Sequence, residues 1–321
     1  MVRRLFILAL MVAVLGLYIP SAIFAQEKIK IGIMPSSDSP QYTETLKGLL
    51  KELKKEGFDE SKATIEIRNA ENKKEMVAEI AKAFRAKKMD VIIPIGTVAA
   101  VGTYNEIKDI PIVFCLIFDP IGAKIANSWE SSGTNTTGSS NWVEMKALIK
   151  VLREVSPGKR IGVIYNETEQ QTVIQLEAFQ KIQDKEGITV VPANLTKAED
   201  AKNVTNGLVG RVDGIYIPGG TVAGQGLDGI MEVAKKAKIP TVSHLLERVE
   251  KGALLAVSAN SSQVGELAGK KAAQVLRGTK PADIPIEYLQ KYDIAVNLKT
   301  AKEMGIRVPV SLLKTAKKVI E

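Results

Sequence analysis

A seven-residue motif that suits anion binding occurs twice in this chain. Residues 93–99 read Ile-Pro-Ile-Gly-Thr-Val-Ala, and residues 217–223 read Ile-Pro-Gly-Gly-Thr-Val-Ala. In both copies an apolar run of strand length ends at the motif and a helical pattern follows it. The free N–H groups and the dipole at the start of a helix favour an anion, and a threonine hydroxyl adds a donor. We therefore expect Thr97 and Val98, and in the second copy Gly220 and Thr221, to contact a ligand.

Other polar residues follow the remaining predicted strands. In open parallel sheets, ligands bind beyond the carboxyl ends of the strands, so these residues are further candidates. They are Ser36, Ser37, Asp119, Asn166, His244 and Asn260. The carboxylate of Asp119 suits a ligand ammonium group. Together with a carboxylate site at Thr97, it would bind the zwitterion of an amino acid.

Several of these residues also have a purely structural interpretation. Thr97 and Thr221 are suited to capping helices, and Asp119 precedes a proline, where it would shape a turn. His244, the single histidine, would otherwise lie in a surface loop. The two tryptophans, Trp129 and Trp142, would either stack on a ligand or pack half-buried against the protein. The sequence leaves these alternatives open.

The repeated motif belongs to a longer internal repeat. The similar segments 30–33 and 160–163 precede the two copies, and an Ile-Pro pair follows each copy, at 110–111 and 239–240. A repeat of this length indicates two similar domains, since the units of solenoid proteins span only about 20–50 residues. Clefts between domains are common binding sites for small ligands. We therefore expect two lobes with a ligand between them.

The elements that position these residues alternate along the chain. Predicted strands cover residues 29–34, 64–68, 91–94, 112–118, 160–165, 189–192, 214–218, 241–243 and 254–258. Predicted helices cover residues 42–56, 73–87, 98–107, 171–186, 198–208 and 226–237. This alternation predicts an α/β fold with two doubly wound parallel-sheet lobes joined by a hinge.

The lobe boundaries follow from the same pattern. We place the N-terminal lobe at residues 26–140, completed by about 261–282. The C-terminal lobe spans residues 141–260 and is completed in part by about 283–321. The segment 127–141, rich in Ser, Thr, Asn and Gly, is predicted to be the hinge or crossover.

Composition excludes several classes of protein. The chain has 321 residues, of which 45% are hydrophobic and 25% charged, as expected for globular domains. The net charge of +8 comes with lysines scattered along helices and only 5% aromatic residues, so no nucleic acid partner is expected. Cys115 is the single cysteine, which excludes an intramolecular disulfide. It lies in an apolar strand and is predicted to be a buried small hydrophobe.

Residues 1–25 have the layout of a secretory signal peptide. Arg3 and Arg4 precede an apolar run from Leu5 to Ile19, which is short for a bilayer span of about 20 residues. We expect cleavage after Ala25; an uncleaved anchor is the alternative. Because no cysteine lies near this site, we expect no lipid anchor on the exported protein.

Six segments carry a resemblance to a known family: 90–100, 110–114, 119–120, 135–138, 252–254 and 297–305. They resemble the substrate-binding proteins of ABC importers, in the group whose characterised members bind tryptophan or phenylalanine. The resemblance implies a type I periplasmic-binding-protein fold that closes around a small-molecule solute. It also implies a periplasmic protein, expected to be a monomer, that delivers this solute to an ABC permease in the inner membrane.

The resemblance is uneven between the lobes. Thr97 and Asp119 match the threonine and aspartate of the family pattern. The second lobe departs from it, with Gly219-Gly-Thr-Val, Ser243-His and Asn260 at positions where the family usually has other polar or acidic residues. The first lobe is therefore expected to bind the common part of the ligand, and the second to determine which solute is taken.

Two other classes of function are alternatives to solute binding for import. An extracytoplasmic ligand sensor for a membrane receptor would use the same fold. An enzyme is disfavoured, since residues 224–229 match G-x-G-x-x-G but do not directly follow a strand. The sequence shows no Gly-x-Ser-x-Gly elbow and no metal-ligand spacing. We expect no enzyme activity, no cofactor and no metal.

Overall fold

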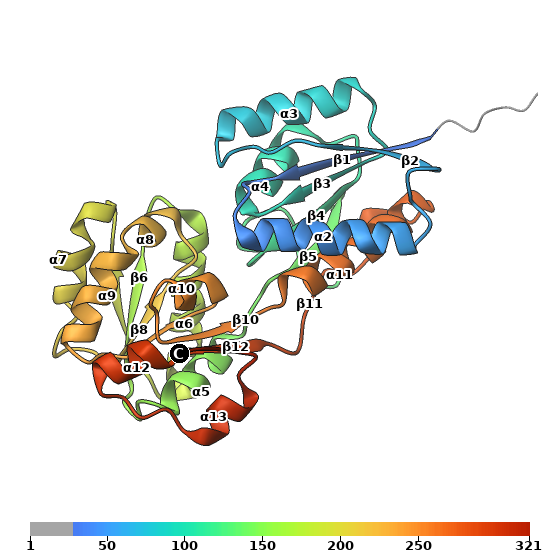
Figure 1. The fold of residues 1–321 in the computed structure, drawn as a ribbon. Coiled ribbons are helices and arrows are strands. Elements are labelled where there is room, and N and C mark those ends of the chain that lie inside the picture. Colours follow the sequence, from blue (N-terminus) through green and yellow to red (C-terminus); the bar gives the residue numbers. More distant parts are fainter. Residues whose placement is uncertain (1–27) are drawn as a thin grey trace, which may run out of the picture.

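The computed structural model describes residues 28–321, which form two α/β lobes (Figure 1). The predicted signal peptide lies outside the described residues. The first lobe has a six-stranded sheet in the order β11-β5-β4-β3-β1-β2. Its elements are β1 (Ile29–Pro35), α2 (Pro40–Lys55), β2 (Ala63–Ile67), α3 (Lys74–Ala86), β3 (Val91–Ile95), α4 (Thr97–Glu106), β4 (Ile112–Ile117), β5 (Thr136–Ser140), α11 (Ser261–Leu276), η2 (Pro281–Asp283) and β11 (Glu287–Tyr288).

The second lobe has a seven-stranded sheet in the order β13-β12-β10-β9-β8-β6-β7. Its elements are α5 (Met145–Arg153), β6 (Arg160–Tyr165), α6 (Gln170–Glu186), β7 (Thr189–Asn194), η1 (Ala198–Asp200), α7 (Ala201–Asn206), β8 (Gly214–Ile217), α8 (Thr221–Gln225), α9 (Leu227–Lys236), β9 (Thr241–Ser243), α10 (Leu246–Glu250), β10 (Leu255–Ser258), β12 (Asp293–Asn297), α12 (Leu298–Met304), α13 (Val310–Thr315) and β13 (Lys318–Ile320). The predicted fold class is confirmed.

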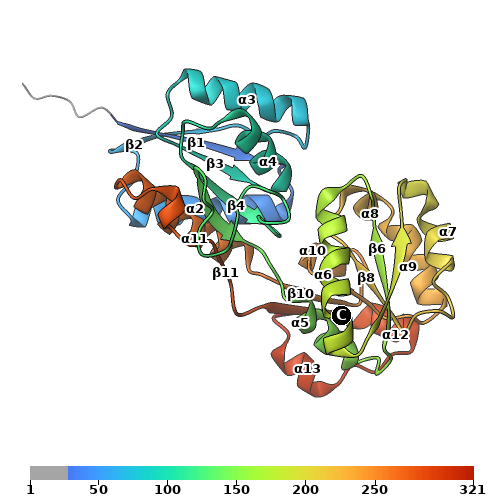
Figure 2. The ribbon, with the colours of Figure 1, turned by 180° about the vertical axis from the view of Figure 1, so that it is seen from behind.

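Helices cover both faces of the first sheet (Figures 1 and 2). Side chains alternate along β1, so Ile31 and Ile33 pack with α2 and α11 while Met34 packs with α3 on the opposite face. Gly32 faces α3, where a Cβ atom would lie 2.8 Å from the ring of Phe84. The strand is therefore buried on both faces, as parallel sheets require.

The segment 127–141 differs from the sequence-based expectation, because its last part is a buried strand. β5 pairs in parallel with β4 and has no exposed residue. Its polar residues are tolerated there because their hydroxyls donate to carbonyls of later segments: Thr137 Oγ1 to Ile284 O at 2.8 Å and Ser139 Oγ to Val264 O at 2.8 Å. The chain crosses between the lobes only after Ser140.

The second sheet also differs, because it is not wholly parallel. β12 runs antiparallel to β10 and brings β13 with it in parallel pairing. The chain leaves the second lobe after β10, forms α11 and β11 against the first sheet, and then returns. It re-enters from the first lobe, so its direction along the sheet edge is reversed.

The internal repeat makes equivalent contacts in the two lobes. Asp90 Oδ2 accepts from the N–H of Lys30 at 2.7 Å, and Asp213 Oδ2 accepts from the N–H of Arg160 at 2.9 Å. Each aspartate therefore ties the third strand of its lobe to the start of the first. The Ile-Pro pairs are equivalent as well, since the carbonyls of residues 111 and 240 accept from the N–H groups of residues 92 and 215.

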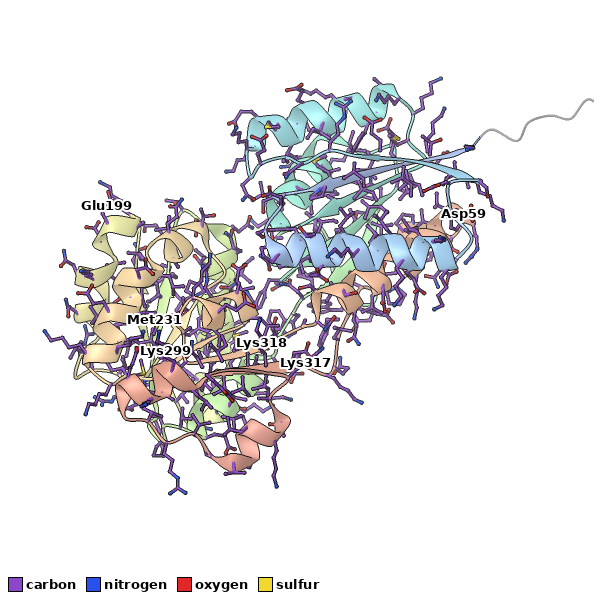
Figure 3. All side chains as sticks on the ribbon, in the orientation of Figure 1. Asp59, Glu199, Met231, Lys299, Lys317 and Lys318 are labelled. Carbon is purple, nitrogen blue, oxygen red and sulfur yellow. The ribbon has the colours of Figure 1, made fainter. Side chains whose placement is uncertain are left out.

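Three crossings connect the lobes within residues 28–321, between β5 and α5, β10 and α11, and β11 and β12. Two of them are tied together. The amide of Asn260 donates to Asp293 Oδ2 at 2.9 Å, and the same oxygen accepts from Lys317 Nζ at 2.9 Å. Lys317 is labelled in Figure 3 at the edge of the second lobe. These bonds join the second and third crossings.

Candidate ligand-binding site

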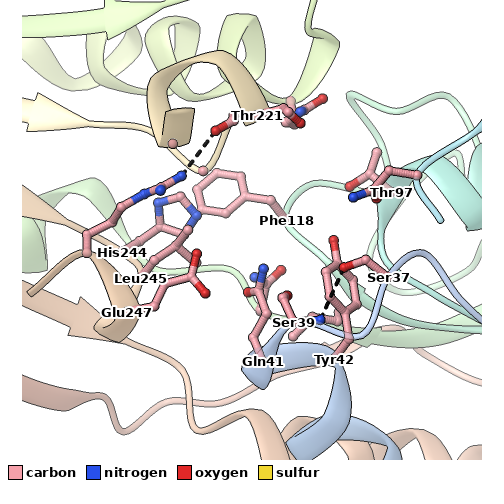
Figure 4. A pocket seen from close by; sticks show the side chains of 18 of the residues that line it. Ser37, Ser39, Gln41, Tyr42, Thr97, Phe118, Thr221, His244, Leu245 and Glu247 are labelled. Atoms are coloured by element: carbon pink, nitrogen blue, oxygen red, sulfur yellow. Dashed lines mark hydrogen bonds between the residues drawn. The ribbon is translucent and has the colours of Figure 1, made fainter. Parts of the chain in front are cut away.

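A cleft with a volume of about 450 Å³ lies between the lobes and is lined by both. Its lining includes the ends of β3, β4, β8 and β9 and the helices that follow them, so the carboxyl ends of the two sheets face each other across it (Figure 4). The first lobe contributes Ser37, Ser39, Gln41, Tyr42, Asn72, Thr97, Val98, Leu116, Phe118 and Asn141. The second contributes Gln171, Gln175, Gly219, Gly220, Thr221, Gly224, Gln225, His244, Leu245, Glu247, Arg248 and Lys251.

The start of α4 forms one wall of the cleft. Gly96 has φ 98°, which favours glycine, and Thr97 and Val98 open the ten-residue helix. The N–H groups of Thr97 and Val98 donate no hydrogen bond within residues 28–321. The third N–H of the turn, that of Ala99, donates to the buried hydroxyl of Ser36 at 3.2 Å. Two donors and the positive end of the helix dipole are thus available to a ligand anion.

The second copy of the motif differs at the same place. Glu169 Oε1 accepts from the N–H groups of Thr221 and Val222, at 3.0 and 3.1 Å. The start of α8 therefore already has a carboxylate bound to it. The threonines do not cap their helices, because glycines 96 and 220 hold the cap positions.

The aromatic ring of Phe118 projects into the cleft between the lobes (Figure 4). Its centroid lies 4.8 Å from that of Trp142 and 5.0 Å from that of His244. The strand before it is irregular: Leu116 has φ 59°, and the pairing of β4 with β5 shifts between residues 114 and 117. Leu116 and Phe118 both line the cleft, so this bulge lies next to its apolar surface.

His244 is a buried, neutral side chain of the cleft wall. It is only 4% exposed, so a surface loop role is wrong. The hydroxyl of Tyr216 lies 2.6 Å from His244 Nδ1. Burial lowers the pKa of His244 from 6.5 to about 3, and the positive charge of Arg248 contributes to this. The imidazole therefore remains uncharged at neutral pH and offers the cleft a polar edge without a charge.

The buried histidine makes stability depend on pH. In the unfolded chain its pKa is close to 6.5, so the unfolded state binds the extra proton first and folding weakens as the pH falls. We expect the free energy of unfolding to fall by about 1.4 kcal/mol between pH 7.5 and pH 5.5 from this group. Urea denaturation at both pH values measures the change. In the His244→Gln variant this contribution should disappear. If the free energy of unfolding falls equally with pH in wild type and variant, His244 is not its source.

Charged and amide side chains that the sequence analysis missed complete the second-lobe wall. Glu247, Arg248 and Lys251 come from α10 and its end, a few residues after the predicted His244. Burial, followed by the negative charge of Glu247, raises the pKa of Tyr42 to about 12, so these two side chains interact across the cleft. The signal for Glu247 and Arg248 was their position in the helix that follows the strand end at Ser243.

Two polar atoms of the cleft lining are buried and unpaired. Within residues 28–321, Asn141 Oδ1 and Arg248 Nε have no hydrogen-bond partner. Arg248 is only 4% exposed, and its Nη2 donates to the carbonyl of Gly220 at 3.1 Å. Burial lowers the pKa of Arg248, while the charges of Glu247 and Glu169 oppose this shift. Unpaired buried polar atoms are costly, and a ligand would relieve this cost.

The structure brings six of the ten predicted site residues to the cleft: Ser37, Thr97, Val98, Gly220, Thr221 and His244. It places the other four elsewhere. The hydroxyl of Ser36 donates to Ile95 O at 2.9 Å and accepts from the N–H of Ala99, so it links β3 to α4. The side chain of Asn166 accepts from the N–H and hydroxyl of Thr168 at 2.9 Å. Asn260 caps α11 and bonds to Asp293 at the crossing.

Asp119 lies at a second cavity, between the turn 119–122 and the helices α5 and α6. Its Oδ1 accepts from the N–H groups of Ile121 and Gly122, at 2.9 and 3.0 Å. This is the turn-shaping role that the sequence left open. Asp119 and Thr97 therefore do not line one cavity, and the expected zwitterion pair is not formed by these two residues.

The remaining alternatives are decided by packing. Trp129 and Trp142 contact each other with centroids 6.2 Å apart, and neither lines the cleft, so half-buried packing is confirmed. Cys115 is fully buried, which confirms its prediction as a small hydrophobe, and burial raises the pKa of its thiol to about 12.

The two lobes and the cleft between them define a solute-binding protein with the type I periplasmic-binding fold. The same fold is found in more distant solute-binding proteins of ABC transporters. Residues 30–320 match the family described as ABC transporter substrate binding protein. The chain therefore belongs to this family. None of the helices described between residues 28 and 321 is long and apolar enough to cross a membrane.

Individual relatives are similar over nearly the whole chain. A tyrosine-binding protein of Clostridioides difficile is 29% identical over 88% of this chain and 83% of its own length. A domain from Streptococcus pneumonia, solved in complex with L-Trp, is 29% identical with a TM-score of 0.82, covering 91% of this chain and 100% of that one. The ligand-free, open structure of a substrate binding protein with adhesive properties from Clostridium difficile is 31% identical with a TM-score of 0.78, covering 91% and 99%.

Proposed function

We propose that this chain is the extracytoplasmic, periplasmic solute-binding protein of an ABC importer and binds an amino acid in the interlobe cleft. The observation that carries the proposal is the start of α4, where the N–H groups of Thr97 and Val98 have no acceptor among residues 28–321 and both residues line a cleft of ligand size. The α-carboxylate of an amino acid matches these donors and the helix dipole. The hydroxyl of Thr97 adds a third donor from the same turn.

The ammonium group of the ligand would bind to side-chain oxygens of residues that line the cleft. Asn141 Oδ1 is buried there without a partner among residues 28–321. Glu247 lines the opposite wall and supplies the negative charge that Asp119 cannot supply from its separate cavity. A buried charged group is stable only when paired, so these two acceptors favour a ligand with a positive charge next to its carboxylate.

The side chain of the ligand would pack on the apolar part of the lining. Phe118, Leu116 and Leu245 supply apolar surface, and neutral His244 supplies a polar edge. Aromatic rings that pack edge to face gain about 0.5–1.5 kcal/mol beyond the burial of their area. The relatives named as binding tyrosine and L-Trp make an aromatic amino acid the first candidate.

Binding is proposed to close the hinge. The lining is divided between the lobes, so a ligand makes its full set of contacts only when both lobes approach it. One relative was solved with its ligand and another ligand-free and open. The closed form would then deliver the solute to a permease.

A thermal-shift screen of the mature chain with the twenty amino acids tests the proposal. A ligand at 100 times its dissociation constant stabilises the folded state by about 2.7 kcal/mol. We expect the largest shift with tyrosine, tryptophan or phenylalanine, followed by confirmation of a one-to-one complex by calorimetry. Recovery of the unchanged ligand after incubation separates a binding protein from an enzyme. The absence of a shift with every amino acid would contradict the proposal.

A further inference from the structure

The two lobes differ at one pair of equivalent positions, and this difference has a functional consequence. Ser39 and Glu169 each stand immediately before the helix that follows the first strand of their lobe, α2 and α6. Ser39 is short and lines the cleft. Glu169 is long enough for its carboxylate to reach the start of α8, where it accepts from two N–H groups. The N–H groups at the start of α4 in the first lobe are available to a ligand, whereas those at the start of α8 in the second lobe already donate to Glu169.

The loop that precedes α8 is built to accommodate this carboxylate. A Cβ atom on Gly220 would lie 2.1 Å from Glu169 Oε2, so a side chain at this position would displace the carboxylate. On the other side, a Cβ atom on Gly224 would lie 2.7 Å from Arg248 Nη1, and the guanidinium donates to the carbonyl of Gly220. The start of α8 is therefore held from both sides, by Glu169 on the N–H groups of Thr221 and Val222 and by Arg248 on the carbonyl of Gly220.

We propose that Glu169 is a built-in anion that makes the start of α8 reject the negatively charged end of a solute, and so sets the cleft to favour monocarboxylates. The inference rests on the proposed function. Glu169 does not line the cleft itself but acts through Gly220 and Thr221, which do, so it is a positioning residue. Glu169 occupies the N–H donors at the start of α8 and offsets the nearby positive charge of Arg248, so this part of the wall does not offer a second anion a binding site.

Ligand selectivity measured by calorimetry tests this role. The two ligands are L-tyrosine and 4-carboxy-L-phenylalanine, which carry a hydroxyl or a carboxylate at the same ring position. We expect wild type to prefer L-tyrosine and Glu169→Gln to reduce that preference by about tenfold, because the charge is lost while Oε1 remains as an acceptor. The matched control is Glu167→Gln, which removes the same charge from an exposed position of the same loop. An unchanged ratio in Glu169→Gln overturns the inference.

A second measurement does not depend on any amino acid. Glu169→Ser gives the second lobe the residue that the first lobe has at the equivalent position and frees two N–H groups. With sulfate as the probe and chloride at matched ionic strength, we expect a sulfate-specific rise in melting temperature for Glu169→Ser and none for wild type or Glu167→Ser. If sulfate raises the melting temperature of all three proteins equally, the inference is overturned. Wild type that binds no amino acid contradicts the proposed function instead, and the sulfate comparison then decides the role of Glu169.

Discussion

Thr97→Pro is expected to weaken binding of the preferred amino acid by about tenfold to a hundredfold without unfolding the protein. Proline is favoured at the first helical position, and Gly96 before it has ψ 156°, which proline tolerates. The substitution removes an N–H group that has no acceptor among residues 28–321, together with the hydroxyl. A hydrogen bond to a charged group contributes about 1.5–3 kcal/mol. Calorimetric titration measures the loss.

Two variants isolate the backbone donor. Thr97→Ala removes the hydroxyl but keeps the N–H group, so it should retain more affinity than Thr97→Pro. Thr221→Pro makes the same change in the second lobe, where the N–H already donates to Glu169. It should lower stability by about 1 kcal/mol and affect affinity less than Thr97→Pro. If the two prolines weaken binding equally, the ligand carboxylate does not lie at α4.

Gly265→Ala is expected to destabilise the first lobe by about 3 kcal/mol, although alanine favours helices more than glycine does. A Cβ atom at Gly265 of α11 would lie 2.0 Å from the carbonyl oxygen of Thr45 in α2. Gly48 faces the other helix in the same way, with its Cβ position 2.0 Å from Ser262 O. Both obstacles are backbone atoms, so the helices must separate to admit one methyl group. Urea denaturation measures the loss.

The control lies on the same helix. Lys270 of α11 is exposed, and Lys270→Ala should change the free energy of unfolding by only a few tenths of a kcal/mol. Helix propensity predicts that Gly265→Ala raises the free energy of unfolding, whereas packing predicts that it lowers it. Stabilisation of that variant would mean that α2 and α11 do not pack this closely.

Local pattern was sufficient for most of the fold. The strands at 160–165 and 241–243 have the predicted bounds, and the buried runs and amphipathic helices of both lobes follow the predicted alternation. Failures occurred where polar residues are satisfied by distant partners. β5 reads as a loop because its Thr and Ser side chains are polar, yet their hydroxyls donate to carbonyls from residues 264 and 284. No local window contains those partners.

The sequence predicted only part of the site, because some of its residues are positioned by contacts that are distant in the sequence. A residue directly after a parallel strand lies at the cleft edge, and this placed Thr97, Thr221 and His244 there. The rule does not say which way a side chain turns: Phe118 lines the cleft, whereas neighbouring Asp119 turns to another cavity. Glu169 and Arg248 act on a loop that lies far from them in the sequence. Such contacts follow only from the packing of one loop against another.

The sequence by itself determined the duplication, the two α/β lobes and the position of the two Gly-Thr-Val-Ala turns, because these follow from local periodicity and the repeated motif. Only the tertiary structure decided that the two turns are not equivalent. The first has two N–H groups at the cleft with no acceptor among residues 28–321, and the N–H groups of the second are bound by Glu169 from a different loop. The physical reason is that a motif fixes which N–H groups a helix start presents, whereas the fold decides which acceptor reaches them.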